Sequence, residues 1–312
     1  MERTRLALIG ISVAAFALAA CDGAGTSVAY IPPPPPPPSP PPPPPPVSNN
    51  PPALPEGPIG LQSDAPFATM AAAYNSQTVT AGNNLVQFAY DSSTDKYTIT
   101  LPGYDTGQLV TKGGNGSYDS TGWIDLQSTY NLVSEGTTNA TQDVGVILPW
   151  PGSSAYRYTS LGNWNSTDWT AWGAFAYGIP TAAGDVPVAG TATYQGEVSG
   201  VSSTAGLVSG TVSLNFDFAN ASLTGVMKPQ VSDWWDSYAL GDYTFRDTSF
   251  ARGATTFSGS FDVPGSTAPS SFAGQFTGPQ AAELMANWTA PYLDPDSSTW
   301  GTMSGVWIAK KP

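Results

Sequence analysis

The chain has 312 residues, a formal net charge of −13, one cysteine and no histidine. Without histidine, Ser-His-Asp and Cys-His nucleophiles and histidine ligands to a metal or haem are excluded. A surface this acidic argues against nucleic acid or anionic lipid headgroups as partners. We therefore expect a protein that is not an enzyme and that holds no metal and no cofactor.

The first twenty residues have the features of a secretory signal. Arg3 and Arg5 precede an apolar run, residues 6–20, that is too short to span a bilayer comfortably. The sequence Leu-Ala-Ala-Cys that ends at Cys21 resembles a bacterial lipobox, whose cysteine becomes the first mature residue and carries the lipid. We predict a signal peptide over 1–20 and membrane lipid attached at Cys21. The alternative is an ordinary signal cleaved nearby, which would leave a free thiol in an oxidising compartment.

Residues 21–59 are predicted to form a disordered, proline-rich stalk. From Pro32 to Pro46 every residue except Ser39 is proline. Such a run adopts polyproline II, so its fifteen residues reach roughly 45 Å at about 3.1 Å each. A ligand for proline-recognising domains is the alternative. Asp22 resembles the inner-membrane retention signal of enteric bacteria, which weakens an outer-membrane assignment without reversing it.

A β-rich domain is predicted over residues 60–186. A hairpin is indicated by alternating apolar residues on either side of a polar turn: Val86, Phe88 and Tyr90, then Tyr97, Ile99 and Leu101. Further strands are expected over residues 121–126, 142–148, 156–164 and 169–177. A linker containing Pro187 and two glycines covers residues 181–190, and we place the domain boundary there.

A second domain, residues 187–312, is predicted to be an eight-stranded antiparallel β-barrel. The alternating segments are 193–198, 212–218, 223–227, 243–250, 257–263, 272–276, 288–292 and 304–309. Glycines between aromatic residues, as at Gly259 and Gly274, would leave room for rings inside a narrow barrel. An open sandwich of two sheets uses the same alternation. Residues 279–285 are expected to form a short helix, because Pro279 is followed by good helix formers.

Four segments of this second domain carry a family resemblance. They are residues 190–196, residues 212–218, residues 272–283 and residues 305–310. In this order and spacing they resemble the barrel module of transferrin-binding-protein-B-like bacterial surface lipoproteins, well over 190–311 and in outline over 60–190. The resemblance implies an all-β fold in which a handle-like domain precedes the barrel, behind a lipidated N-terminus.

The resemblance also implies a role. Members of the family capture a ligand through barrel and handle loops at the cell surface, and the best known bind an iron carrier protein that is passed to an outer-membrane transporter. Smaller relatives bind haem, haemophores or complement factors. This chain has one barrel where the receptor has two lobes, and no receptor contact residue maps onto it.

Two groups of aromatic residues are candidates for ligand binding. Trp234, Trp235 and Tyr238 lie between two predicted strands, where consecutive tryptophans cannot both point inward. They would be exposed contact residues or a plug over the barrel mouth. In the handle, a binding platform and a core or cross-strand position are the alternatives for three tryptophans: Trp164, Trp169 and Trp172. Asp294 and Asp296 could face a calcium ion, and a solvated turn is the alternative.

These observations predict a monomeric, lipid-anchored protein on the outer membrane, exposed at the cell surface. It would capture a protein or small ligand, with iron or haem acquisition and an outer-membrane transporter as the setting that the family implies. The alternative is a periplasm-facing structural lipoprotein with no uptake role. A carboxylate-based glycosidase would need two acids facing each other across a cleft, and the sequence offers no such pair.

Overall fold

The computed structural model describes residues 56–57, 60–61, 63–94, 96–103, 107–110, 117–118, 123–125, 144–149, 156–166, 169–204, 206–232 and 236–312. The predicted signal peptide, Cys21, the proline-rich stalk, Trp234 and Trp235 lie outside these ranges. Within the ranges, no helix has the length and apolar character that crossing a bilayer requires.

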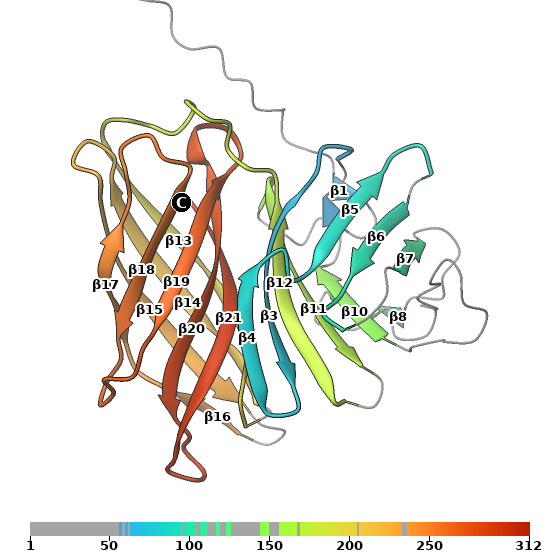
Figure 1. The fold of residues 1–312 in the computed structure, drawn as a ribbon. Coiled ribbons are helices and arrows are strands. Elements are labelled where there is room, and N and C mark those ends of the chain that lie inside the picture. The colour runs from blue at the N-terminus through green and yellow to red at the C-terminus, as the bar shows by residue number, and fades with distance from the viewer. Residues whose placement is uncertain are drawn as a thin grey trace, which may run out of the picture. The chain divides into compact units, whose positions relative to one another are not determined.

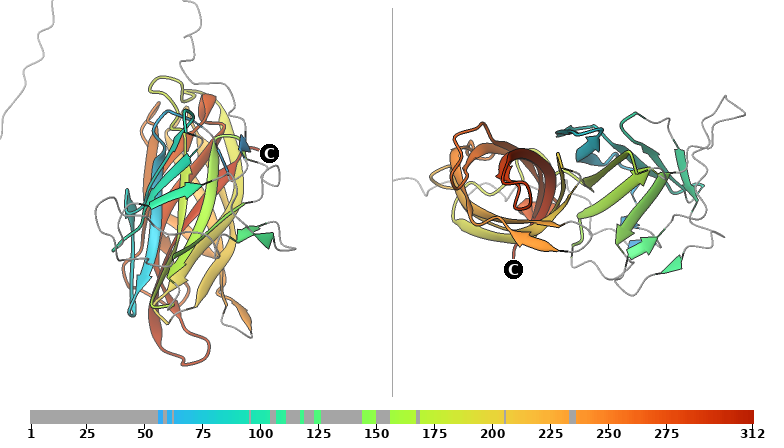
Figure 2. Two further views of the ribbon diagram at one scale, coloured as in Figure 1. Left: turned by 90° about the vertical axis from the view of Figure 1, so that its right-hand side faces the viewer. Right: turned by 90° about the horizontal axis from the view of Figure 1, so that it is seen from below.

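The C-terminal part is a closed antiparallel barrel of eight strands, as predicted (Figures 1 and 2). The pairing of the first and last strands, from Gln195↔Lys310 to Ser202↔Met303, closes the sheet and excludes the open sandwich. The strands are β13 (Thr191–Ser202), β14 (Leu207–Asp217), β15 (Ser222–Ser232), β17 (Tyr243–Ser249), β18 (Thr256–Asp262), β19 (Ser271–Thr277), β20 (Glu283–Leu293) and β21 (Trp300–Lys310). A short strand, β16 (Ser237–Ala239), pairs with the end of β15.

Aromatic rings fill the inside of the barrel. Phe216 lies 4.9 Å from Phe276 and 5.1 Å from Phe257, measured between ring centroids. Glycine makes this packing possible, because a Cβ on Gly274 would lie 2.3 Å from the ring of Phe257. A Cβ on Gly259 would likewise meet the ring of Phe272 at 2.5 Å. The predicted role of these glycines is therefore confirmed, and the inner wall is a filled core.

The predicted helix over 279–285 is wrong. Only Pro279–Ala281 forms a single 3-10 turn, and β20 begins at Glu283. Helix propensity is a weak preference that tertiary packing overrides. Here Leu284 points into the barrel core, while its neighbour Met285 packs against the β-rich part that precedes the barrel in the chain, which we call the handle. Both faces of the strand are buried, so its sequence lacks the alternation that would have revealed it.

The N-terminal part holds a seven-stranded sheet that a three-stranded sheet covers. In spatial order the first contains β4 (Thr78–Asn83), β3 (Ala68–Asn75), β12 (Ala171–Gly178), β11 (Thr159–Ser166), β10 (Val144–Pro149), β9 (Trp123–Asp125) and β8 (Ser117–Tyr118). The second contains β5 (Gln87–Asp91), β6 (Lys96–Thr100) and β7 (Gly107–Val110), and a separate pair is formed by β1 (Glu56–Gly57) and β2 (Gly60–Leu61).

The predicted hairpin is confirmed as β5 and β6, and its Phe88 ring lies 4.4 Å from that of Tyr177 across the two sheets. Strands β9 to β12 coincide with the four other predicted segments. Strands β3 and β4 were not predicted. Residues Met70 to Tyr74 of β3 are buried on both faces, so this alanine-rich segment shows no alternation.

One face of the seven-stranded sheet packs directly on the barrel. Ala174 and Ala176 of β12 meet Val306 and Ile308 of β21 in one buried cluster, which Met285 also joins. Because alanine is small, the two backbones can approach closely. Polar contacts flank this cluster: Asn287 donates to Asn83 at 2.6 Å, and Ser199 donates to Asn163 at 2.9 Å.

A buried carboxylate, that of Glu283, joins the same two parts. Its Oε1 accepts from the backbone N–H of Arg157 at 2.6 Å and its Oε2 from that of Tyr158 at 3.0 Å. The residue is only 4% exposed. Burial raises the pKa of Glu283 above its ordinary value, although these two N–H groups act in the opposite direction. Ionising the Glu283 carboxyl therefore costs more free energy in the folded state than in the unfolded state.

This cost predicts a pH dependence of stability. A carboxyl whose pKa is raised on folding stabilises the fold at pH values below its unfolded pKa, near 4.5, and loses that contribution as the pH rises through the folded pKa. We expect Glu283→Gln to flatten this part of the profile of unfolding free energy against pH, measured by urea denaturation. Glu283→Ala should cost about 1–3 kcal/mol, because two hydrogen bonds from partly buried N–H groups are lost. Parallel profiles for the wild type and Glu283→Gln would contradict the assignment.

Candidate functional site

One end of the barrel gathers the turns that could meet a ligand. It is formed by the β13–β14, β18–β19 and β20–β21 turns and by residues 236–242, which precede β17, and we call it the Trp300 end (lower end of the barrel in Figure 1). The turns are hydrogen-bonded to the barrel strands. Ser203 N donates to Thr302 O at 2.8 Å, and Thr302 N donates to Ser203 Oγ at 3.1 Å. The end is thus built on the rigid sheet.

Tyrosines seal the barrel beneath these turns. The buried Tyr243 donates its hydroxyl to Pro291 O at 3.0 Å, and the hydroxyl of buried Tyr292 is hydrogen-bonded to Thr204 Oγ1. Burial raises the pKa of Tyr243, so this hydroxyl stays protonated and keeps its donor role. Because the inside is filled and this end is sealed, a ligand would contact the outside of the turns.

The β20–β21 turn is held by its own aspartate. Asp294 Oδ1 accepts from the backbone N–H groups of Asp296, at 2.9 Å, and Ser297, at 3.3 Å. Ser298 N donates to Asp294 O at 2.9 Å. In the part of the chain that the structure describes, no group of three acidic, cysteine or histidine residues could hold a metal ion. The carboxylate of Asp294 acts here as a turn acceptor.

This turn presents two apolar side chains to solvent. Leu293 and Trp300 are register partners across the hairpin, 46% and 47% exposed. Leu207, at the same end of the barrel, is 61% exposed. These are three of the five large apolar residues exposed among the described residues; the others are Trp169 and Val188. Exposed apolar residues concentrated on one rigid end are a feature of interaction surfaces.

Tyr238 connects β16 to the same turn. It is half-buried against the barrel core, and its hydroxyl donates to Asp296 Oδ1 at 3.2 Å. The structure thus brings this predicted residue to the end that holds Trp300. Trp234 and Trp235 lie outside the described residues, and in the sequence they fall between Ser232, which ends β15, and Asp236.

Acidic residues surround the apolar ones at this end. Asp236 and Asp296 are exposed. Asp242 and Asp262 are exposed too, and each forms an ion pair, with Lys228 at 3.2 Å and with Arg246 at 2.9 Å. The basic side chains nearby are therefore engaged in pairs, and the surface keeps an excess of negative charge.

The structure separates the three handle tryptophans. Trp164 is buried in the core between the two handle sheets. Trp172 is partly buried on the face toward the barrel, stacked on Tyr74 at 4.0 Å with 23° between the ring planes. Trp169 stands on the β11–β12 turn, is 52% exposed and has φ 56°. No shared platform results, and Trp169 alone of the three could reach a surface ligand.

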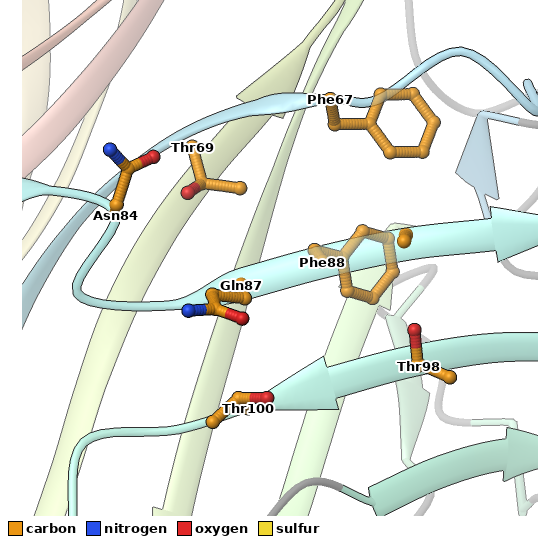
Figure 3. A pocket seen from close by; sticks show the side chains of 8 residues that line it. Phe67, Thr69, Asn84, Gln87, Phe88, Thr98 and Thr100 are labelled. Carbon is orange, nitrogen blue, oxygen red and sulfur yellow. The ribbon is translucent and has the colours of Figure 1, made fainter.

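A small pocket lies elsewhere, in the handle (Figure 3). Its volume is about 200 Å³, below the roughly 300–1,000 Å³ usual for ligand sites. It is lined by Phe67, Thr69, Asn84, Gln87, Phe88, Ala89, Thr98 and Thr100. None of these residues was predicted to bind a ligand. The pocket is too small to make it the preferred site.

No family model and no curated protein sequence matches the chain. Solved structures do. Transferrin binding protein B from Haemophilus parasuis matches at 13% identity over 79% of this chain and 45% of its own, with a TM-score of 0.47. Isotype 1 of that protein from Neisseria meningitidis matches at 15% over 78% and 43%, with a TM-score of 0.44. A surface lipoprotein matches at 15% over 80% and 100%, with a TM-score of 0.30.

Two of these three structures are of transferrin binding protein B, the protein whose family the sequence motifs resemble. The chain spans less than half the length of the first two structures, and at this identity the likeness concerns the fold alone.

The exposure of Trp300 predicts that it contributes little to stability. We expect Trp300→Ala to lower the free energy of unfolding by about 1 kcal/mol or less, because about half of the side chain is already in water. Trp307→Ala, on the same strand but fully buried, should cost about 3–5 kcal/mol. Urea denaturation of both variants measures the difference. Equal losses would mean that Trp300 is a structural residue.

Proposed function

We propose that the chain is a lipid-anchored bacterial surface protein that binds a protein ligand through the Trp300 end. The observation that carries this proposal is the exposed pair Leu293 and Trp300, held on a turn that its own aspartate and the barrel keep in place. Such a surface is ordered before binding, so little side-chain and loop entropy is lost on association. Aromatic side chains of this kind often dominate interface energies.

The shape of the end favours a protein over a small molecule. The barrel is filled and sealed by Tyr243 and Tyr292, so the apolar residues stand on turns rather than inside a cavity. Small ligands usually need a concave site that buries most of their surface. A protein can instead supply the concave partner surface, into which the indole of Trp300 would insert.

The charge around the site indicates the chemistry of the partner. Four exposed aspartates, Asp236, Asp242, Asp262 and Asp296, lie at this end. Two of them are paired with Lys228 and Arg246, and the chain as a whole has a net charge of −13. A partner with an apolar pocket and a basic rim would complement this surface. Rim charges act mainly on the association rate, which should therefore fall as the salt concentration rises.

The N-terminal sequence supports the cellular setting. Cys21 would carry lipid in the outer membrane, and the proline-rich stalk would hold the barrel away from the bilayer. Iron or haem acquisition, with transfer to an outer-membrane transporter, is the role that the sequence resemblance implies. A periplasm-facing structural lipoprotein is the second candidate, which Asp22 favours.

A binding experiment with matched tryptophan variants tests the proposal. The wild-type protein is immobilised, exposed to growth medium or host fluid, and the captured protein is identified and its affinity measured. We expect Trp300→Ser to weaken that affinity by about 30-fold, the equivalent of about 2 kcal/mol for an interface anchor. Trp169→Ser, which removes an equally exposed tryptophan from the handle, should leave the affinity unchanged. A larger loss of affinity for Trp169→Ser than for Trp300→Ser, or equal losses for both, would contradict the assignment of the binding site to the Trp300 end.

A further inference from the structure

Strand β4 forms an outer edge of the seven-stranded handle sheet. It pairs with β3 on one side, from Met70↔Asn83 to Asn75↔Thr78, and no described strand pairs with its other side. The register is continuous over all six residues, without a bulge. Figure 1 shows β4 beside β21 of the barrel.

The register reveals which backbone groups point outward. Asn84 N donates to Thr69 O at 3.1 Å, so these two residues form a hydrogen-bonded pair. Hydrogen-bonded and non-hydrogen-bonded pairs alternate along an antiparallel ladder. The N–H and C=O groups of Val79, Ala81 and Asn83 therefore point away from β3. Within the described ranges these backbone groups have no hydrogen-bond partner.

This edge lacks the devices that usually protect an unpaired strand. Natural edges are blunted by lysine, proline, bulges or very short strands. The strand reads Thr-Val-Thr-Ala-Gly-Asn, and residues 65–90 contain no charged side chain and only one proline, Pro66, well before the strand. An unprotected edge of six residues is expected to be covered by a partner.

The edge is also held in position. Asn83 Oδ1 accepts from Asn287 Nδ2 of the barrel at 2.6 Å. Val79 and Ala81 pack against a buried cluster that contains Tyr74 and Val201. The edge thus stays extended and ready to pair, and a ligand would not have to order it first.

We propose that β4 accepts an extended, uncharged segment of another protein as an added strand. The segment would pair its backbone with Val79, Ala81 and Asn83, the mode of recognition known as β-strand addition. The surface beside the edge suits an uncharged segment: the outer face of β19 and β20 there carries Ala273 and Thr289, both partly exposed.

A second copy of the chain fits this edge poorly. Antiparallel pairing of two β4 strands would place both barrels on the same face of the joined sheet. Because β4 lies directly on β20 and β21 of its own barrel, the second barrel would be forced toward the first. Each chain also carries a net charge of −13.

Hydrogen exchange of single amides tests the proposal on the full mature chain. The probe is a capped hexapeptide of alternating threonine and valine at millimolar concentration. We expect it to slow exchange at Val79, Ala81 and Asn83 by at least about tenfold, while Thr80 and Gly82, already bonded to β3, remain unchanged. Residue-resolved fragmentation mass spectrometry reads this alternation.

Two controls keep the test decisive. Ala81→Pro removes an outward N–H and should abolish the protection, whereas Thr80→Val changes a side chain only and should preserve it. If Ala81→Pro fails to fold, the same peptide methylated on alternate amide nitrogens provides the control, because it cannot complete the ladder.

Three results would overturn the proposal. The first is no protection by the peptide. The second is protection of the three outward amides in the free, dilute protein, which would mean that another part of the chain covers the edge. The third is protection that grows with protein concentration alone, together with a dimer in sedimentation, which would mean that a second copy is the occupant.

Discussion

The pairing of β21 with β20 on one side and β13 on the other is the constraint on which the rest of the structure depends. It closes the barrel, so neither strand keeps an unpaired edge. From Met303 to Ala309 every residue of β21 is buried, with Trp307 in the barrel core and Val306 and Ile308 against the handle. One strand thus belongs to both cores. The same pairing fixes the turn that presents Trp300.

Most of the barrel could be predicted from sequence, because most of its strands have one face in the core and one in water. The row from Val212 to Phe218 alternates for that reason. Where both faces are buried the pattern disappears, and prediction failed there: Leu284 and Met285 were assigned to a helix, and β3 was missed. Burial on a second face depends on contacts between distant parts of the chain, which local periodicity does not contain.

The candidate site was predictable only in part. The aromatic residues between β15 and β17 were predicted to be exposed contacts or a plug over the barrel mouth, and the half-buried Tyr238 reaches the Trp300 end. Trp300 itself was missed because it follows a polar turn and precedes the strand expected from residue 304. Its exposure next to Leu293 follows from the hairpin register, which sequence spacing alone did not reveal. The three handle tryptophans could not be distinguished by residue type. Trp164 lies in the handle core, Trp172 lies on the face toward the barrel, and Trp169 lies on a turn.

A filled barrel that presents a small apolar and acidic end, preceded in the chain by a proline-rich segment and by a cysteine that we propose to be lipidated, accounts for the proposed capture of a protein ligand outside the cell. Intact-cell labelling tests this most directly. Cys21 is the chain's one cysteine, so Ser297→Cys places a single additional thiol on the exposed β20–β21 turn. The account predicts that a membrane-impermeant maleimide labels this variant on intact cells. Labelling only after the outer membrane is permeabilised would contradict it.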